Sequence, residues 1–476
     1  MADSDDAFFA ATLEDEKKLY YALGSLEYVK LVSDKWTSEV EGEQGKNSES
    51  VGKREEDVFS HHSAFAETLK SAVNFCLSQY QILILLSSFE SGIATVYIKN
   101  EILGKLEKDG EPVSSENGVK IYKIGPKLQS EVFENEKRAE VLKLGSEKIG
   151  PSVFLGMVAS FDALIVDIVG KLIQQNPSRF VSNDKTIPIS DIIEADSIDD
   201  IVKNFVADEL FRFSRESHDF QNSYIEKQFS IKIRDSWKRY SAYIEVFERR
   251  NLVAHGEKKF NARYATICER VGHKGVQEQI GQPLKLSFAY QRQAIYLLSE
   301  YAILLSFVLW RKYAADKEDE AFETLNEAAY KLIQDGHYVL AERILDFALS
   351  LKNSDVREEL QKMIVVNHAS ALGRTDNQEA CAKALETRDW SGSALQFQLS
   401  VAALKKDIDT VIKLVPQARA LGFDMISFRS WPVFRFIRED EKFNDALEAA
   451  YGERLKEAHS VVEHDDAAAA GDTTLH

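Results

Sequence analysis

Cysteine, proline and glycine are all scarce in this chain of 476 residues. The three cysteines, Cys76, Cys268 and Cys381, lie far apart and form no CxxC pair, which argues against a disulfide framework and against a cysteine zinc site. We expect them to be reduced thiols in the core of a cytoplasmic protein. The eight prolines and 23 glycines are fewer than average usage would give, so long uninterrupted helices are expected.

Targeting and membrane signals are also missing. The first residues, Met1–Asp6, are acidic, which does not suit a secretory leader. The strongest apolar run, Ile82–Leu86, is short, and Glu90 follows it closely, so we expect no membrane-spanning segment. These features predict a soluble protein of the cytoplasm that does not bind membranes.

Several common catalytic motifs are absent as well. No Gly-rich phosphate loop, serine nucleophile elbow or H-E-x-x-H pair occurs, which leaves the NTPase, serine hydrolase and zincin classes without support. The histidines have no metal-ligand spacing to Cys, Asp or Glu, and we interpret these as structural or exposed: His61, His62, His218, His273 and His337. We expect neither a metal nor another cofactor.

The net charge is strongly negative. At −18, the chain does not resemble a protein that coats duplex nucleic acid through its phosphates, although a small local RNA site remains compatible with this total. Hydrophobic residues make up 44% of the chain and aromatic residues 10%, which is enough for folded domains. The length predicts two to four of them.

The region 1–145 has the weakest pattern and is predicted to be helical or mixed. Leu19–Val32 and Ala64–Leu86 have helical character, and the charged segment Glu41–Glu56 between them predicts a mobile loop. Ala94–Ile98 and Val119–Ile124 contain β-branched and aromatic residues on either side of a polar turn, which indicates a small hairpin. No chemistry is indicated in this region.

The region 146–315 is predicted to be an antiparallel helical bundle. Apolar residues recur every three or four positions in four stretches: Phe154–Leu172, Ile201–Leu210, Trp237–Phe247 and Ile295–Leu309. Asn176-Pro177 should end the first helix, and Ser197 with Asp200 resembles a capping box before the second. Four such helices can enclose one core.

The region 316–455 is predicted to be an array of helical hairpins that begins after the charged run Asp316–Glu323. Its first unit has small or packing residues at the offsets of a tetratricopeptide repeat: Gly336, Tyr338, Ala341 and Ala348. Seventy residues later, about two repeats, Ile408, Val411, Val415 and Ala418 match Tyr338, Ala341, Leu345 and Ala348 in character. The unit around Asn367–Leu385 is degenerate, Trp431–Phe443 resembles a capping end, and 456–476 is expected to be a disordered tail.

One polar cluster interrupts the apolar stripe of the third bundle helix. The spacing of three and four residues along that helix places Asn251 at a position where an apolar residue is expected. A buried amide there needs hydrogen-bond partners. His255 lies one turn further on nearly the same face, Arg250 is adjacent, and Gly256 allows the helix to stop. The helix end therefore gathers a guanidinium, an amide and an imidazole.

These groups suit metal-independent RNA cleavage. Histidine can move a proton near neutral pH, and arginine can bind a phosphate that gains charge in the transition state. Asn251 would orient the imidazole or a phosphate oxygen. The local charge agrees, because residues 249–263 contain a single acidic residue, Glu257, against five basic ones, Arg249, Arg250, Lys258, Lys259 and Arg263.

Residues 150–313 resemble the HEPN superfamily. The resemblance rests on Arg250-Asn251-Leu252-Val253-Ala254-His255, on Ser160-Phe161-Asp162, on Glu209–Ser217, and on Asn261 and Tyr264. HEPN ribonucleases use an arginine, four to six residues and then a histidine. The resemblance implies that Arg250 and His255 are catalytic with Asn251, and that two copies pair through this domain as a homodimer. It also implies a toxin or a phage-defence (abortive-infection) effector.

The remaining residues of the motif region receive supporting roles. The resemblance implies that Asn261 and Tyr264 support the motif. Asp162 and Glu209 are candidates for orienting Arg250 or His255, although they also suit solvated helix positions or structural ion pairs. We interpret these as RNA-binding: Arg249, Lys258, Lys259 and Arg263.

Two functions follow as alternatives. The first is an endoribonuclease that cuts tRNA or mRNA, with the repeats sensing or binding a protein partner. The second is a non-catalytic HEPN and repeat scaffold that binds RNA, a nucleotide or a protein. The intact set of Arg250, Asn251 and His255 favours the first alternative, and the acidic total favours the second.

Overall fold

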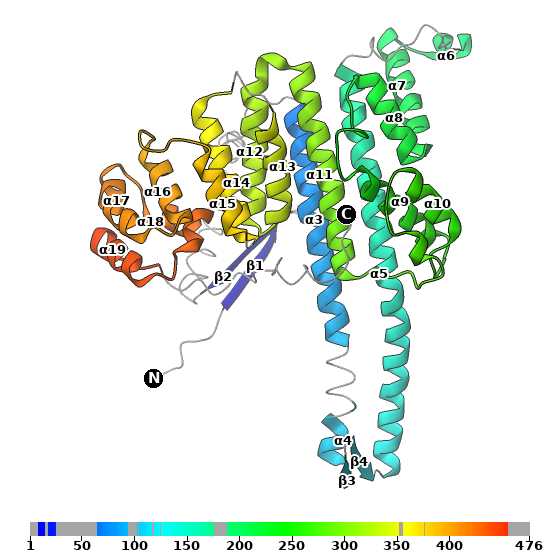
Figure 1. The fold of residues 1–476 in the computed structure, drawn as a ribbon. Helices are drawn as coiled ribbons and strands as arrows, with labels where there is room; N and C mark the ends of the chain where they lie inside the picture. The colour runs from blue at the N-terminus through cyan, green and yellow to red at the C-terminus, as the bar shows by residue number, and fades with distance from the viewer. Residues whose placement is uncertain are drawn as a thin grey trace, which may run out of the picture. The chain divides into compact units, whose positions relative to one another are not determined.

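The computed structural model describes residues 8–14, 18–24, 64–93, 102, 104–116, 119–123, 125–175, 188–351, 356–375 and 377–455. The chain divides into two units, Met1–His62 and Ser63–His476. The described residues are mainly helical, with two short antiparallel hairpins (Figure 1). The predicted loop Glu41–Glu56 and the predicted disordered tail 456–476 lie outside the described residues.

The first unit contains a hairpin of β1 (Phe8–Glu14) and β2 (Lys18–Gly24), in which Phe8 lies opposite Gly24 and Glu14 opposite Lys18. The helix predicted from Leu19 is therefore wrong as far as Gly24, and its remainder lies outside the described residues. Tyr20 and Tyr21 have a high strand propensity, and pairing with β1 outweighs the weak helical pattern.

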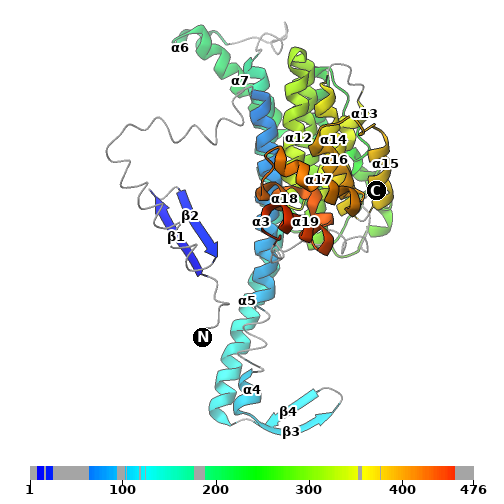
Figure 2. The ribbon, with the colours of Figure 1, turned by 90° about the vertical axis from the view of Figure 1, so that its left-hand side faces the viewer.

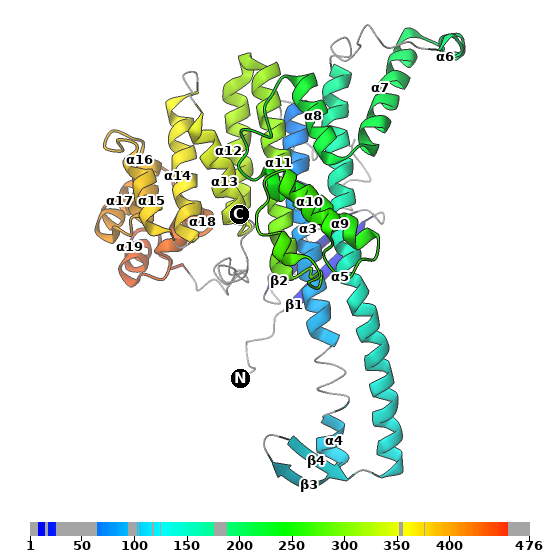
Figure 3. The same cartoon turned by 45° about the vertical axis from the view of Figure 1, so that its right-hand side comes forward.

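The second unit begins with a helical bundle, as predicted. Its helices are α3 (Ala64–Ile93), α5 (Pro126–Gln175), α7 (Ile198–Arg215), α8 (His218–Phe229), α9 (Tyr240–Ala254), α10 (Ala262–Arg270) and α11 (Phe288–Tyr313), with the short α6 (Ile189–Glu194) before α7. The long helix α11 packs against α3, α5 and α9. It therefore forms the centre of the bundle (Figures 1 and 3).

The apolar stripes predict the bundle core well. The apolar residues of α5 from Phe154 to Leu172 on the predicted stripe are buried, and so are those of α11 from Ile295 to Leu309. Ser197 caps α7 as predicted, because its hydroxyl accepts a hydrogen bond from the Asp200 backbone N–H at 3.2 Å. Helix α8 was not anticipated, since its buried residues include the polar pair Gln221 and Asn222.

Helix α5 runs without a break through the predicted domain boundary at residue 145. Helix α3, from the region whose fold was left open, packs against α5 and α11 and contributes to the same core. The first half of α5 extends past the other bundle helices and contacts α4 (Gly104–Asp109), which in turn contacts β3 (Figures 1 and 2).

A second hairpin lies at this end of α5. It pairs β3 (Glu111–Glu116) with β4 (Val119–Lys123). The strand predicted at Val119–Ile124 is confirmed over β4. Its partner is β3, whereas the predicted partner Ala94–Ile98 lies outside the described residues.

Helical hairpins follow the bundle, as predicted. They are built from α12 (Glu318–Gln334), α13 (Tyr338–Ser350), α14 (Glu358–Arg374), α15 (Gln378–Glu386), α16 (Leu395–Leu404), α17 (Ile408–Ala420), α18 (Met425–Ser430) and α19 (Glu441–Tyr451). The predicted spacing of 70 residues is confirmed, because α13 and α17 start 70 residues apart and each contain 13 residues. Neighbouring helices of the array contact one another, among them α12 with α13, α13 with α14, and α16 with α17 (Figure 1).

The same packing positions are used in both matching helices. Ala341, Leu345 and Ala348 of α13 are fully buried, and so are their counterparts Val411, Val415 and Ala418 of α17. Gly336 has a φ of +86°, a left-handed conformation that favours glycine, and so ends α12 before α13 begins.

The bundle and the first hairpins share one continuous core that reaches from Phe65 to Ala371. The charged run Asp316–Glu323 spans the end of a short 3-10 helix, Ala315–Lys317, and the first residues of α12, where acidic side chains suit the positive end of the helix dipole. A buried carboxylate on α11, Glu300, also joins the two parts. It accepts hydrogen bonds from Arg239 Nη1 at 3.0 Å and from Arg343 Nη1 of α13 at 3.3 Å.

The third predicted helix begins later than expected, after a residue that binds Glu300. The indole of Trp237 donates to Glu300 Oε1 at 2.8 Å, and α9 starts three residues later, at Tyr240. Trp237 was predicted within this helix, and the structure corrects that assignment. The stripe that follows it, through Ile244 and Phe247, is buried as predicted.

Among the residues that the structure describes, three helices are long and apolar enough to cross a membrane, judged by length and composition alone: α3 over Ala64–Phe89, α5 over Pro126–Gln174, and α11. From the sequence we expected no membrane-spanning segment, because the strongest apolar run is short. Isolated charged residues interrupt such runs, although the helices that contain them remain apolar as a whole. In α11, 89% of the apolar window is buried inside the protein, so core packing accounts for its composition. In α3 and α5 the buried share is 44%.

A substitution at Gly373 tests the packing of α14 against Phe436. A methyl group at this position of α14 would lie 2.9 Å from two ring atoms of Phe436, so Gly373→Ala should lower the unfolding free energy by about 1–3 kcal/mol. Thermal and urea unfolding measure the effect. Gly156→Ala is the matched control, since Gly156 is an exposed helical glycine of α5 with open space around it, and this variant should be neutral or stabilising. Equal effects of the two substitutions would contradict the packing described.

Candidate active site

The candidate site forms where α9 ends. The Gly256 N–H bonds to the Val253 carbonyl at 3.0 Å, and the Glu257 N–H bonds to the Leu252 carbonyl at 3.0 Å. Gly256 has a φ of +71°. These features make a Schellman cap, which confirms the predicted stop at Gly256 and leaves His255 exposed at the helix terminus.

The chain then folds back against α9. Residues 258–260 pair with residues 281–284 through backbone hydrogen bonds that include the Phe260 N–H to the Gln282 carbonyl at 3.1 Å. Asn261 starts α10, because its Oδ1 accepts from the Tyr264 backbone N–H at 3.0 Å. Leu252, Phe260 and Tyr264 belong to a small core between α9 and α10. This core holds α10 beside the end of α9 (Figure 3).

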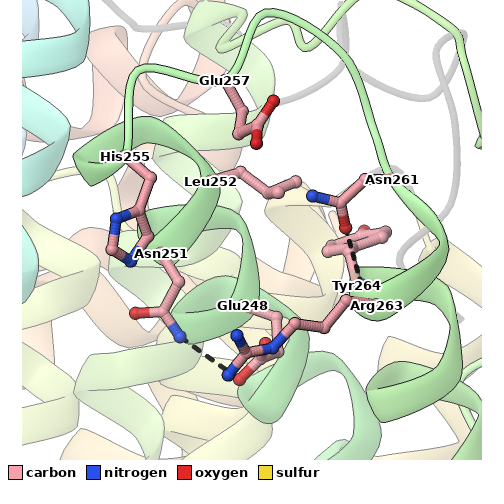
Figure 4. A pocket seen from close by; sticks show the side chains of 8 residues that line it. All are labelled: Glu248, Asn251, Leu252, His255, Glu257, Asn261, Arg263 and Tyr264. Carbon is pink, nitrogen blue, oxygen red and sulfur yellow. Dashed lines mark hydrogen bonds between the residues drawn. The ribbon is translucent and has the colours of Figure 1, made fainter.

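A pocket of about 470 Å³ lies between these two helices (Figure 4). It is lined by Glu248, Asn251, Leu252, His255, Glu257, Asn261, Arg263 and Tyr264. Five of these residues were selected from the sequence as catalytic, supporting or RNA-binding candidates: Asn251, His255, Asn261, Arg263 and Tyr264. The structure therefore brings an imidazole, two amides and a guanidinium to one cavity.

Glu248 is one of three pocket residues that were not predicted from the sequence as site residues; the other two are Leu252 and Glu257. Asn251 Nδ2 donates to Glu248 Oε1 at 3.3 Å, and burial raises the pKa of the Glu248 carboxyl above its ordinary value against the opposing charge of Arg263. The helical spacing does contain a signal for it. Glu248, Asn251 and His255 stand at i, i+3 and i+7, so they share one face of α9.

Arg250 lies on a different face of α9. Its Nη2 is 3.3 Å from Asp162 Oδ2 of α5, and Asp162 Oδ1 is 2.7 Å from His218 Nε2 of α8. Arg250 and His255 are five residues apart, which turns their side chains about 140° from one another around the helix. Asp162 therefore contacts Arg250, as predicted for one of its two possible roles. Arg250 does not line the pocket of its own chain.

His218 anchors this second cluster from inside the bundle. Its ring is stacked on Phe247 with 3.3 Å between ring centroids, and only 9% of its side chain is exposed. Burial lowers the pKa of His218 below 6.5, although the hydrogen bond to Asp162 opposes this shift. A neutral imidazole that donates from Nε2 to the carboxylate satisfies both effects.

Arg249 has a structural environment. Its Nε donates to Glu245 Oε1 at 2.7 Å, and its guanidinium lies 3.7 Å from the ring centroid of Tyr290. Glu245 is fully buried and also accepts from the hydroxyls of Tyr264 at 2.6 Å and Tyr290 at 2.9 Å. The structure thus places Arg249 in a buried ion pair, outside the pocket lining, although the sequence suggested RNA binding.

The remaining predicted site residues include two exposed lysines, a buried glutamate and a tyrosine of the pocket wall. Lys258 and Lys259 are exposed on the loop that leads to α10, outside the pocket lining. Glu209 is buried on α7, where its Oε1 accepts from Arg212 at 3.3 Å. Tyr264 lines the pocket, but its hydroxyl is committed to Glu245, which makes it a support of the cavity wall.

In the part of the chain that the structure describes, no cysteine lines the pocket and no cluster of metal ligands is found. All three cysteines are free and buried, as predicted, and burial raises the pKa of the Cys76 thiol to about 12. Among the described residues, no group of three or more His, Cys, Asp or Glu side chains is arranged to hold a metal ion.

The buried ion pair is expected to control stability. Glu245→Ala leaves the Arg249 guanidinium without its carboxylate, so the unfolding free energy should fall by about 3–5 kcal/mol, measured by urea unfolding. As a control, Glu379→Ala removes an exposed partner of Lys383 on the surface and should leave unfolding nearly unchanged. A Glu245 variant as stable as this control would show that the ion pair contributes little.

His218 is expected to make stability depend on pH. Its pKa in the folded protein lies below the unfolded value of 6.5, so the unfolded chain takes up the proton first and stability falls as pH decreases through and below 6.5. The slope from one such group is at most about 1.4 kcal/mol per pH unit. Urea unfolding from about pH 7.5 to about pH 5.5 should therefore show a weaker pH dependence in His218→Gln than in the wild type. The same dependence in both proteins would contradict this assignment.

Comparison with known proteins found no match to a protein-family model, to a curated protein or to a solved structure. The resemblance to HEPN domains and tetratricopeptide repeats rests on the residues of this chain. The function of the pocket has to be inferred from its chemistry.

Proposed function

We propose that the pocket at the end of α9 is the active site of a metal-independent endoribonuclease. The observation that carries this proposal is the presence of Asn251, His255 and Arg263 around one cavity of about 470 Å³. A cavity of this size admits a nucleotide. His255 is exposed at its edge and accessible to an RNA strand.

The chemistry of RNA cleavage explains why these three groups belong together. The 2′-hydroxyl attacks the adjacent phosphorus, a proton is delivered to the leaving 5′-oxygen, and the phosphate gains negative charge in the transition state. The His255 imidazole can transfer the proton. The Arg263 guanidinium and the Asn251 amide can hold the phosphate oxygens.

The charge around the pocket supports RNA as the substrate. Lys258 and Lys259 are exposed on the loop beside it, so an RNA backbone that enters the pocket would pass two further cations. This basic region belongs to a chain with a net charge of −18, which limits nucleic-acid contact to a small area. Such an arrangement suits tRNA or mRNA in a local, single-stranded conformation.

A homodimer belongs to the proposal. Arg250 is turned toward Asp162 and away from the pocket of its own chain, so a site that uses both Arg250 and His255 would need a second copy of the α9 end nearby. The resemblance to HEPN ribonucleases implies pairing of this kind.

The proposed role in the cell is that of a toxin or a phage-defence effector in the cytoplasm. The resemblance to HEPN domains supports it, and the hairpin array offers a surface for a protein partner that senses infection or restrains cleavage. Glu300 provides a physical link between the two parts, because it binds Arg239 beside the bundle and Arg343 in the array.

A non-catalytic scaffold is the second candidate. The observation that favours it is the commitment of Arg250 to Asp162, which leaves the pocket with Arg263 as its nearest guanidinium. In this case the bundle would bind RNA, a nucleotide or a protein without cutting RNA.

Cleavage of labelled tRNA and mRNA in EDTA tests the proposal. We expect the wild type to cut RNA and to leave 2′,3′-cyclic phosphate ends. His255→Ala should lower the rate by about 100-fold or more because it removes the proton-transfer group. Arg263→Ala should also slow cleavage, because it removes the cation that faces the phosphate.

The matched control is Arg388→Ala, which removes an exposed arginine outside the pocket and should keep wild-type activity. All variants should retain the melting temperature of the wild type. Cleavage that survives in His255→Ala, or a wild type that leaves RNA intact, would reject the enzyme and favour the scaffold.

A further inference from the structure

One face of α9 carries three polar residues in a row along the pocket. Glu248, Asn251 and His255 all line the cavity, and Arg263 lies across from them on α10 (Figure 4). From Glu248 to His255 the helix advances seven residues, which is two turns and a rise of about 10.5 Å. The carboxylate and the imidazole therefore lie at the two ends of the row, with the amide of Asn251 between them.

RNA cleavage through the 2′-hydroxyl requires two proton transfers. One group must accept the proton of the 2′-hydroxyl, and another must give a proton to the 5′-oxygen that leaves. Because attack and departure occur in line, these two groups have to stand on opposite sides of the phosphate. His255 can supply one of them, and the proposed function leaves the other unassigned.

We propose that Glu248 is the general base of this reaction and that His255 is its general acid, an inference that rests on the proposed function. The Glu248 carboxylate takes the proton of the 2′-hydroxyl as the bond from O2′ to phosphorus forms. The His255 imidazolium gives its proton to the 5′-oxygen as the bond from phosphorus to O5′ breaks. The products are a 2′,3′-cyclic phosphate and a 5′-hydroxyl end.

The surroundings of Glu248 suit a base. Asn251 donates to its Oε1 at 3.3 Å, which orients the carboxylate. Its charged neighbours are Arg263 and Arg270 of α10 and Arg250 of its own helix. Burial outweighs these positive charges and raises the pKa of Glu248, which makes the carboxylate a stronger proton acceptor than a solvated glutamate.

The second carboxylate in the pocket is less suitable. Glu257 lies just beyond the C-terminal cap of α9, at the His255 end of the row, and it is exposed. A phosphate bound at Asn251 would have Glu257 and His255 on the same side. Glu248 alone among the carboxylates lining the pocket faces the phosphate from the opposite end.

The pH profile of kcat/KM tests the assignment. We expect a bell-shaped profile for the wild type, because the base must be deprotonated and the acid protonated. Glu248→Gln should lower kcat/KM by about 100-fold or more and abolish the acidic limb. Glu248→Asp keeps a carboxylate on a shorter side chain, and should retain the acidic limb with a reduced rate.

Glu269→Gln serves as the control for removing a carboxylate on the surface of α10. Glu269 is exposed, accepts from Gln277 Nε2 at 2.8 Å and should leave the profile unchanged. If His255→Ala is inactive while Glu248→Gln keeps the acidic limb and the wild-type rate, the assignment of Glu248 fails and the ribonuclease stands. If the wild type leaves RNA intact, both fail.

Discussion

The buried carboxylate of Glu245 organises the candidate site. It is fully buried on α9 and accepts hydrogen bonds from Arg249 of the same helix, from Tyr264 of α10 and from Tyr290 of α11. A charge removed from water costs several kcal/mol unless donors surround it, so the three helices must meet at this point. Arg263 precedes Tyr264 directly, and the position of its guanidinium opposite α9 therefore depends on the same contact.

The end of α9 presents two polar faces with different partners. Asn251 and His255 face the pocket, whereas Arg250 faces Asp162 and, through it, the buried His218 of α8. A short linear motif thus divides between a solvent-accessible cavity and a partly exposed ion pair with α5. In the proposed enzyme the first face carries the proton transfers. The second holds a guanidinium in a fixed orientation, available to a second copy of the domain.

The bundle and the first hairpins of the array share one hydrophobic core. Their core extends without a gap from α3 to α14, and the carboxylate of Glu300 is held by arginines on both sides of the junction. Glu300 also accepts a hydrogen bond from the indole of Trp237, and Trp237 and Arg239 lie directly before α9.

The sequence by itself determined the helical fold class, the apolar stripes of α5 and α11, the cap at Ser197 and the register of 70 residues between α13 and α17, because each depends on local periodicity. Local pattern also selected Asn251, His255 and Arg263 of the pocket, and the resemblance to HEPN domains added Asn261 and Tyr264. Tertiary structure alone decided that Arg249 pairs with the buried Glu245, that Arg250 leaves the pocket and that Glu248 enters it. Neighbouring charges on one helix look alike in sequence, and only the elements packed against each face of α9 separate a structural ion pair from an open cavity.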